Sequence, residues 1–491
     1  MSRFLSSKFL PVAAGFTLAT LAWLPLVAAE AAPPASAGRS AEHARIVEHW
    51  TPARRAAATP RDFVLDEAGN AFLKLPHGGL ELYGRPTGGA AQPMAKPGGG
   101  GGGNPTEISG MDPASGVTIG ANYTFKAKVT DLDGVRSVAF SIRKGTARAQ
   151  NFSATLSNAA EGIWSTSLQG FSDGDWSWQV VAKDATNTTT SSAVVSFKVA
   201  TGGGGSGGGG GDGSVTNSPW TKAGDLQTAA GRIYFEMPSN SRRTRWAGYV
   251  CSGTVVTDGT SGRSVILTAA HCVYDDANKA FARNVLFIPN QDQTTGTGTD
   301  RNCDNDPLGC WTPNFGVVDV NWTTRTFPNN KAWDYAYYVV SDSGRHTGTS
   351  VSDTALDVTA KSVGISFAAP QTGVFTYALG YSYSDDPLYM YCAANMTTEG
   401  ADNWWVPGCG LSGGSSGGSW SQDDLPTTGT GAAMSVNSWG YTTSPGMAGP
   451  KLDGTSASRL FCRARTEVIG SVPTSDGNAG VTVSAGTATC P

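Results

Sequence analysis

Charged residues are scarce in this chain: they make up 15% of its 491 residues, and the formal net charge is −4. No basic cluster large enough for a nucleic-acid interface occurs, so we expect no nucleic-acid partner. Histidine is also scarce, with five residues, and no C-x-x-C pair is present. A metal site built on the cysteines is therefore a weak interpretation.

Cysteine is absent from the first 250 residues, and all eight cysteines lie from Cys251 onward. An even number of cysteines in an exported chain favours disulfides. Eight cysteines allow many different pairings, so their spacing alone does not assign the pairs.

Long apolar runs are absent beyond the N-terminus, so no later segment predicts a membrane span. At the N-terminus, Arg3 and Lys8 precede a mostly apolar stretch at residues 9–27, and small residues follow it. This pattern predicts a secretory signal peptide over residues 1–31, with an uncleaved membrane anchor as the alternative. We expect a secreted, extracellular protein with no membrane contact after the signal is removed.

Two glycine runs divide the remaining chain, because glycine-rich segments behave as flexible tethers. They predict one linker at residues 98–103 and a second at residues 202–219. The segment before them, residues 32–97, is too small and too polar for a large core, and its position suits a pro-region. A disordered spacer fits its composition nearly as well. Two larger units remain, at residues 104–201 and 220–491.

Residues 104–201 alternate apolar and polar side chains in short runs, with turns such as Asp133-Gly134 between them. A period of two predicts strands, and short strands separated by such turns predict a β-sandwich. In this pattern the segment resembles the Ig-like or fibronectin-III-like modules of secreted bacterial enzymes, and we expect an Ig-like sandwich. Trp164, Trp176 and Trp178 are expected in its core, although exposed aromatic residues could instead bind a surface or a polymer. The clearest strand runs are residues 123–129, 138–142, 176–182 and 194–199.

Helical periodicity is rare in residues 220–491, where short apolar runs recur between loops. This pattern predicts an all-β unit built as a pair of barrels. The strand runs on which this prediction depends are residues 231–235, 253–256, 264–267, 285–288, 335–340 and 432–436.

One stretch, residues 267–273, places His271 at the end of an apolar run and beside Cys272. An imidazole takes up and releases a proton near neutral pH. A serine nucleophile needs such a base, a third group that holds the base, and backbone N–H donors for the oxyanion. The glycine-rich residues 409–420 offer G-x-S-G-G twice, on Ser412 and on Ser416. Composition leaves both serines open, and a glycine-serine linker is the alternative.

Four motifs, in this order along the chain, resemble the chymotrypsin-like family of serine peptidases over roughly residues 220–465. The most similar branch is the bacterial secreted one related to glutamyl endopeptidases, whose G-G-S-S-G-G-P-W register selects Ser416. The early W-T-P-x-R stretch, residues 50–54, is similar to a pro-region motif of that branch. The motifs are T-A-A-H-C at residues 268–272, D-x-A at 334–336, G-S-S-G-G-S at 414–419 and S-W-G at 438–440.

The resemblance implies a double six-stranded β-barrel of the chymotrypsin type, preceded by the Ig-like sandwich. It also implies a catalytic triad, in which Ser416 is the nucleophile, His271 is the general base and Asp334 orients His271. The backbone N–H groups of Gly414 and Ser416 would form the oxyanion hole.

The same resemblance implies how a substrate binds and how the cysteines pair. Ser438, Trp439 and Gly440 would pair with the substrate backbone as an extra strand. The implied disulfides are Cys251–Cys272, Cys303–Cys310 and Cys392–Cys409, which leaves Cys462 and Cys490.

Four positions depart from the family. Ser415 stands where many members have the aspartate that pairs with the new N-terminus, so a pro-region here must act in another way. Ser419 replaces a proline, a mild change. Gly410 stands where a trypsin-like pocket needs an aspartate, and Asn437 stands where glutamate-selective members have a histidine. We therefore expect a preference for neutral side chains.

Several other polar residues have plainer interpretations. His346 lies in a polar segment and is expected at the surface. Asp319 and Asp342 are rivals of Asp334, but neither has the D-x-A context. The acidic residues 300–306 could bind calcium through oxygen ligands, although such a run is more often a solvated loop. We otherwise expect no metal and no cofactor.

The sequence thus predicts a secreted, monomeric serine endopeptidase that hydrolyses protein or peptide substrates through an acyl-enzyme. A non-catalytic adhesion or binding protein on a peptidase scaffold is the alternative from another class. An esterase or other acyl hydrolase is a second alternative, disfavoured by the chain order His271, Asp334, Ser416.

Overall fold

The computed structural model describes residues 35–483, apart from residues 67, 76–79, 84–105, 121, 132–133, 146, 148, 159–161, 170, 186–187, 200–213, 297–300, 348–349, 443, 471 and 473–479. The predicted signal peptide, residues 1–31, and the first glycine linker, residues 98–103, lie outside the described residues. Most of the second linker, Asp300 and Cys490 lie outside them as well.

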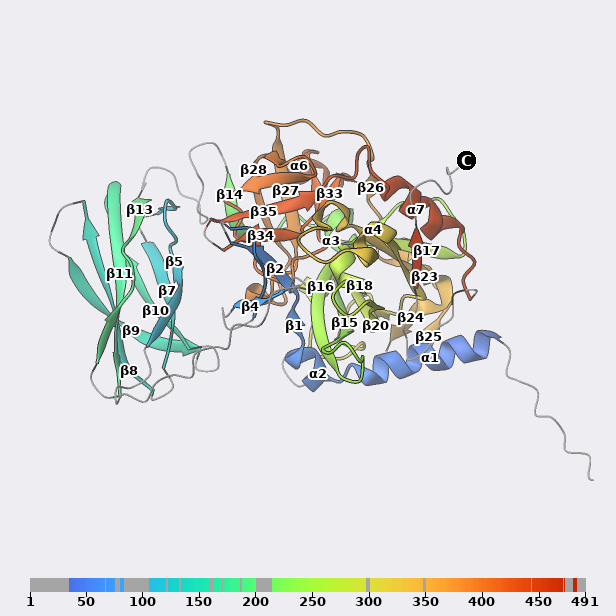
Figure 1. The fold of residues 1–491 in the computed structure, drawn as a ribbon, viewed down its shortest axis with the longest axis horizontal. Helices are drawn as coiled ribbons and strands as arrows, with labels where there is room; N and C mark the ends of the chain where they lie inside the picture. Colours follow the sequence, from blue (N-terminus) through green and yellow to red (C-terminus); the bar gives the residue numbers. More distant parts are fainter. Residues whose placement is uncertain are drawn as a thin grey trace, which may run out of the picture.

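Strands dominate the described residues, and the predicted all-β class is confirmed. Figure 1 shows a smaller β-rich body in cyan and green and a larger one in green to red. The N-terminal segment, drawn in blue, lies along the larger body. Among the described residues, no helix is long and apolar enough to cross a membrane.

The smaller body is one set of nine strands, in which β9 pairs with both β8 and β10. Alternate residues face inwards, so Trp178 is buried, whereas Trp164 and Trp176 are half-buried against the same core. The order is β5 (Glu107–Asp112), β7 (Asn122–Thr130), β10 (Ile163–Gln169), β9 (Gln150–Asn158), β8 (Val135–Lys144), β11 (Gly174–Asp184), β13 (Val195–Val199) and β6 (Thr118–Ile119), with β12 (Thr189–Ser191) on β11.

The largest sheet has eleven strands, and its central strands are almost continuously apolar and buried, as expected for strands covered on both faces. Its order is β25 (Ser350–Ser352), β24 (Arg345–Thr347), β21 (Cys310–Trp311), β20 (Arg283–Pro289), β15 (Ala230–Pro238), β16 (Trp246–Val256), β17 (Arg263–Thr268), β23 (Ala336–Ser341), β22 (Phe315–Asp319) and β36 (Gly480–Val483), with β1 (Thr59–Pro60) on β16.

Two smaller sheets complete the larger body and enclose a second core, which contains Met390, Trp404 and Trp420. The five-stranded sheet has the order β14 (Val215–Pro219), β28 (Met390–Asn395), β27 (Phe375–Gly380), β31 (Ser419–Ser421) and β33 (Ser435–Val436). The seven-stranded sheet has the order β29 (Thr397–Glu399), β30 (Asn403–Pro407), β35 (Gly446–Pro450), β34 (Trp439–Tyr441), β2 (Asp62–Leu65), β3 (Ala71–Lys74) and β4 (Leu80–Leu82).

The remaining elements are short, apart from the helices α1 and α7. Two ladders pair β18 (Tyr274–Asp275) with β19 (Ala280–Phe281) and β26 (Gly364–Ile365) with β32 (Ala432–Ala433). The helices are α1 (Ala35–His49), α2 (Pro52–Ala57), α3 (Asp225–Ala229), α4 (Val320–Thr324), α5 (Leu356–Thr359), α6 (Leu425–Thr428) and α7 (Ala457–Thr466). The 3₁₀ turns are η1 (Ala270–Cys272), η2 (Gln291–Gln293), η4 (Lys331–Trp333), η5 (Asp342–Gly344) and η6 (Tyr383–Asp385).

The end of the second predicted linker differs from the structure, and the N-terminal segment packs on the larger body. Residues 215–219 were expected in the second linker, but they form β14, which pairs with β28 and covers an edge that would otherwise be unpaired. Within the expected pro-region, residues 32–97, the described strands β1 to β4 join the sheets of the larger body. Neither pairing has a local sequence signal, since the partners lie far apart in the chain.

Candidate active site

His271 is held at the end of β17 by the tight turn η1, and its side chain is fully buried. The Thr268 hydroxyl donates to the Ser252 carbonyl oxygen at 2.8 Å, which fixes the end of β17 against β16. The disulfide Cys251–Cys272, with an S–S distance of 2.02 Å, ties η1 to the same strand. The backbone around His271 is therefore held by a hydrogen bond before it, at Thr268, and by a disulfide after it, at Cys272.

Asp334 follows η4, is fully buried and holds His271 at two points. Its Oδ2 lies 2.7 Å from Nδ1 of His271, and its Oδ1 accepts from the His271 backbone N–H at 2.8 Å. The Ser438 hydroxyl also donates to Oδ2, at 2.5 Å. Burial opposes ionisation of Asp334, but the positive charge of His271 and these hydrogen bonds outweigh burial and lower the pKa of Asp334.

The rivals of Asp334 lie on other elements. The Asp319 side chain accepts from the backbone N–H of Asn321 and so caps α4. Asp342 begins η5 and makes no contact with His271. The structure thus brings together the histidine and the aspartate that the sequence selected.

Ser416 lies on the predicted glycine-rich turn, where Gly414 and Gly417 have φ values of +91° and +83° that favour glycine. Its carbonyl oxygen accepts from the Ser252 backbone N–H at 2.7 Å and lies 3.8 Å from Cys272 Sγ. A methyl group built on Gly417 would lie 2.2 Å from Thr268 Oγ1. The turn therefore packs closely against the loop that carries His271.

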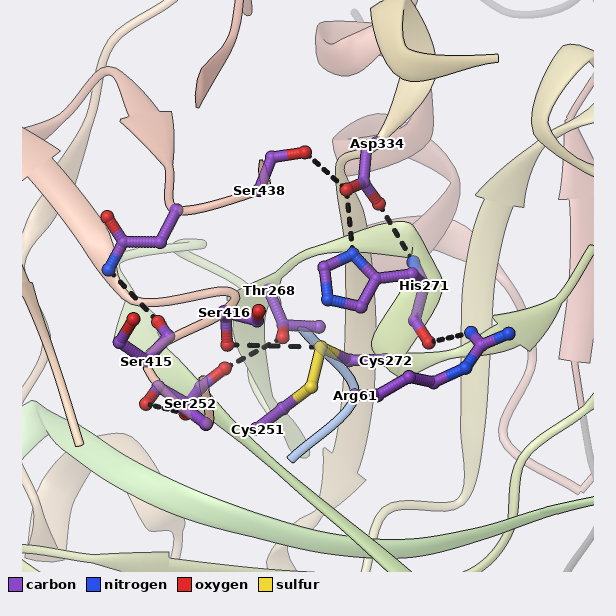
Figure 2. The surroundings of a disulfide bond; sticks show 12 residues. Arg61, Cys251, Ser252, Thr268, His271, Cys272, Asp334, Ser415, Ser416 and Ser438 are labelled. Atoms are coloured by element: carbon purple, nitrogen blue, oxygen red, sulfur yellow. Dashed lines mark hydrogen bonds and ion pairs between the residues drawn. A yellow bond between two sulfur atoms is a disulfide. The ribbon is translucent and has the colours of Figure 1, made fainter. Parts of the chain in front are cut away.

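Figure 2 shows Ser416 on the side of the His271 ring that faces away from Asp334. Nε2 of His271 is buried and makes no hydrogen bond to any described residue, Ser416 included. Catalytic hydrogen bonds are often long in free enzymes and shorten in the substrate complex. Nε2 is thus the atom of His271 that is left to exchange a proton.

The turn also presents N–H donors. Within the described chain, the backbone N–H groups of Gly414 and Ser416 donate to no carbonyl or side-chain oxygen, whereas Gly417 donates to Asn437 at 2.8 Å. Two unused donors beside a serine are the arrangement that an oxyanion hole requires. Ser412, the other candidate serine, lies 2.9 Å from the hydroxyl of Ser384 and is not beside His271.

The three disulfide pairs implied by the resemblance are confirmed: Cys251–Cys272, Cys303–Cys310 and Cys392–Cys409. Cys462, left over at the sequence level, is also disulfide-bonded.

Two sequence interpretations meet a different structure. His346 was expected at the surface but is fully buried, with its ring 6.0 Å from that of His43 on α1. Burial, followed by the neighbouring His43, lowers the pKa of His346 to about 4. Asp306, one of the candidate calcium ligands, forms a buried ion pair with Arg55 at 3.0 Å. A cation bound to Asp306 would have to compete with this guanidinium.

The expected substrate strand is not free, which sequence reasoning missed. Phe63, Val64 and Leu65 of β2 pair with Trp439, Gly440 and Tyr441 of β34. The apolar run Phe63-Val64-Leu65 was a visible signal for a buried strand, but no local pattern names its partner.

Comparisons with known proteins add no assignment. No family model matches the chain, and no curated protein matches it. Among solved structures, CopC from Methylosinus trichosporium OB3b is 12% identical, with 20% of this chain and 97% of that one covered, at a TM-score of 0.17. Fibronectin(III)-like modules of CbhA from Clostridium thermocellum are 18% identical, with 19% and 94% covered, at a TM-score of 0.15. TM-scores this low support neither a fold family nor a function.

Proposed function

We propose that the chain is a serine endopeptidase of the chymotrypsin-like type, secreted and synthesised with an N-terminal pro-region. The observation that carries the proposal is the buried contact of 2.7 Å between Asp334 and Nδ1 of His271, which leaves Nε2 of His271 unpartnered on the side of Ser416. In this proposal, the eleven-stranded sheet forms one barrel, and the five- and seven-stranded sheets form the other.

The proposed reaction begins when Ser416 Oγ attacks the scissile carbonyl carbon and passes its proton to Nε2 of His271. Asp334 accepts from Nδ1–H and stabilises the imidazolium that forms. The backbone N–H groups of Gly414 and Ser416 donate to the oxyanion. His271 then gives the proton to the leaving amine, and water hydrolyses the acyl-enzyme by the same route in reverse.

The proposed substrates are proteins or peptides with neutral side chains at the cleaved position, because neither Gly410 nor Asn437 supplies a charged partner. Asn437 is fully buried, and its amide donates to the carbonyl oxygens of Leu379 and Ser415 at 2.8 and 3.0 Å. It therefore supports the turn before Ser416.

The test compares Ser416→Ala with Ser412→Ala in the secreted protein, before and after limited digestion that removes the N-terminal segment. We expect Ser416→Ala to lower peptide hydrolysis by at least about 10³-fold and to abolish fluorophosphonate labelling. Ser412→Ala, as the matched control, should retain most of both. Labelling that persists in Ser416→Ala would show that the nucleophile is a different residue.

A further inference from the structure

The edge of β34, where the resemblance implies that a substrate binds, is occupied by a segment of the same chain. β2 pairs with β34 in parallel, in the register Phe63 to Trp439 and Leu65 to Tyr441, and the Thr442 N–H donates to the Leu65 carbonyl oxygen at 2.9 Å. β34 pairs with β35 on its other side. No edge of β34 is therefore left for a substrate strand.

Phe63 covers the imidazole itself. Its side chain is fully buried, and its ring centroid lies 5.0 Å from that of His271 in an edge-to-face contact. On its other side it stacks on Phe327 at 4.6 Å, with 12° between the ring planes. While Phe63 is in this position, a substrate side chain beside His271 has no room.

The direction of β2 distinguishes it from a substrate. In an acyl-enzyme, the part of the substrate before the cleaved bond stays on the enzyme, so a substrate held by β34 runs from Tyr441 towards Ser416. β2 runs the other way: a methyl group built on Gly413 would lie 2.7 Å from Asp62 Cβ, and the residues after Asp62 pair further along β34. A strand of reversed polarity offers different hydrogen bonds and does not place a carbonyl carbon as a substrate would.

Arg61 fastens the segment to the loop of His271. Its side chain is buried, and its Nη1 donates to the His271 carbonyl oxygen at 2.5 Å. Nη2 lies 3.5 Å from Asp275 and 3.7 Å from Asp276, and it donates to the Tyr83 hydroxyl at 2.7 Å. Figure 2 shows this guanidinium beside the backbone of the catalytic histidine.

A second anchor lies upstream of β1, beside the disulfide Cys303–Cys310. Arg55 lies 3.0 Å from Asp306, and both side chains are only 2% exposed. Its Nη2 also lies 3.2 Å from both sulfur atoms of Cys303–Cys310. The Trp50 indole N–H donates to the Asn284 carbonyl oxygen. The conformation of residues 59–65 is thus held from both ends, by Arg55 on one side and by the β3–β4 strands with Tyr83 on the other.

From these contacts we infer that the described part of residues 50–83 has a further activity: it is a peptide inhibitor of the peptidase site, where residues 61–65 lie with reversed strand polarity and without being cut. The inference rests on the proposed function, because it assigns an inhibitor to the same site. Two residues would inhibit the site: Phe63, whose ring packs on that of His271, and Arg61, which binds the His271 carbonyl oxygen and so holds β2 in place.

The test measures fluorophosphonate labelling of Ser416 in the full chain, in wild type, Phe63→Ala, Arg61→Ala and Arg54→Ala. Arg54 is the matched control, since it belongs to the same segment, its side chain is 54% exposed, and an exposed ion pair as long as its 3.9 Å approach to Glu236 contributes little. We expect Phe63→Ala to be labelled at least about tenfold faster than wild type, because loss of a buried phenyl ring weakens docking by at least that factor. Arg54→Ala should match wild type. Equal labelling rates in wild type and Phe63→Ala would overturn the inference and leave the peptidase proposal intact.

Hydrogen exchange separates the two proposals. The amides of residues 439–442, which lie along β2, should be protected in wild type and exchange faster in Phe63→Ala. Release of these amides without any labelling of Ser416 would overturn the proposed function, and the inhibitor assignment with it. Arg61→Ala leaves Asp275 and Asp276 without their guanidinium partner. If that variant does not fold, the exchange and labelling of Phe63→Ala decide the test.

A synthetic peptide of residues 50–83 tests the reversed polarity. Added to the Phe63→Ala protein, it should suppress labelling and remain intact by mass spectrometry. Rapid cleavage of the peptide within residues 59–65 would mean that it binds as a substrate, and the inference would be wrong.

Discussion

Asp334 makes three hydrogen bonds at the centre of the candidate site, and a carboxylate is the only side chain of this shape that accepts all of them. An asparagine would place an amide N–H against either Nδ1 of His271 or one of the other donors. If the amide donates to Nδ1, His271 carries its proton on Nε2 and no longer accepts one from Ser416.

We therefore expect Asp334→Asn to lower kcat/KM of the activated enzyme by roughly 10³- to 10⁴-fold, with the fold retained. The measurement is peptide hydrolysis at neutral pH after removal of the N-terminal segment. Asp342→Asn, which changes the rival aspartate on η5, is the control and should keep its activity. A fully active Asp334→Asn enzyme would exclude Asp334 from the triad.

Asp62 makes docking of the N-terminal segment depend on pH. Its burial raises the pKa of its carboxyl group above the ordinary 3.8, although Lys74 and His271 act in the opposite direction. The docked segment therefore binds a proton more tightly than the free one. Docking is strongest below the ordinary pKa and weakens as the pH rises through the docked pKa.

Asp62→Asn removes this charge at every pH. We therefore expect the N-terminal segment of this variant to dock on β34 more tightly than that of wild type at pH 7, and about equally at pH 4. The measurement is amide exchange of residues 439–442 in both proteins at each pH. Faster exchange in Asp62→Asn than in wild type at pH 7 would contradict the expectation.

At the scale of elements, the turn at residues 412–418 shows why glycine recurs there. A methyl group on Gly418 would lie 1.9 Å from the Leu379 carbonyl oxygen, and one on Gly417 would lie 2.2 Å from Thr268 Oγ1 and 2.4 Å from the Ser252 carbonyl oxygen. The absence of side chains is what allows the turn to approach the strands that carry His271.

Gly417→Ala should separate this turn from β17. The positive φ alone costs about 1–3 kcal/mol, and the overlap with Thr268 adds to it. We expect a lower melting temperature and loss of peptide hydrolysis. Gly408→Ala shares the positive φ but has open space at its Cβ, so it should lose stability without losing activity.

The contact between α1 and β24 depends on uncharged histidine. The pKa of His346 is lowered from 6.5 to about 4 by burial and by His43. Because the folded chain holds His346 neutral, its stabilising contribution is present above pH 6.5 and is lost as the pH falls towards 4.

We expect the melting temperature of wild type to fall more between pH 7 and pH 4 than that of His346→Gln, which has no such proton to take up. Thermal unfolding at a series of pH values provides the measurement. Parallel profiles for the two proteins would contradict this role for His346.

At the scale of the whole molecule, the features predicted correctly from the sequence are those that leave a pattern in neighbouring residues. Period-two runs predicted the strands of residues 104–201, and short apolar runs predicted those of the larger body. The T-A-A-H-C and S-S-G-G motifs selected His271 and Ser416. The contacts of Arg55, Arg61 and Phe63 could not be predicted, because they join residues near the N-terminus to residues more than two hundred positions away and leave no local pattern. The burial of His346 has the same cause, since its cover comes from α1.

These long-range contacts also determine whether the N-terminal segment stays bound after the chain is cleaved between it and the β-sandwich. The N-terminal segment is held by the Arg55–Asp306 pair, by Arg61 and by strand pairing on two sheets. We expect that cleavage at a protease site inserted into residues 98–103 leaves the segment bound, and that the two pieces elute together in size-exclusion chromatography. Separation of the pieces in buffer at neutral pH would show that these contacts are too weak to hold the segment without the covalent link.

The parallel pairing of β2 with β34 has a consequence for biosynthesis. A ribosome completes residues 62–65 long before residues 439–441, so the blocking strand already exists when its partner strand emerges. Under the proposed function, residues 62–65 are therefore already present when the strand that they cover is formed. A trigger for activation would then act on the folded chain.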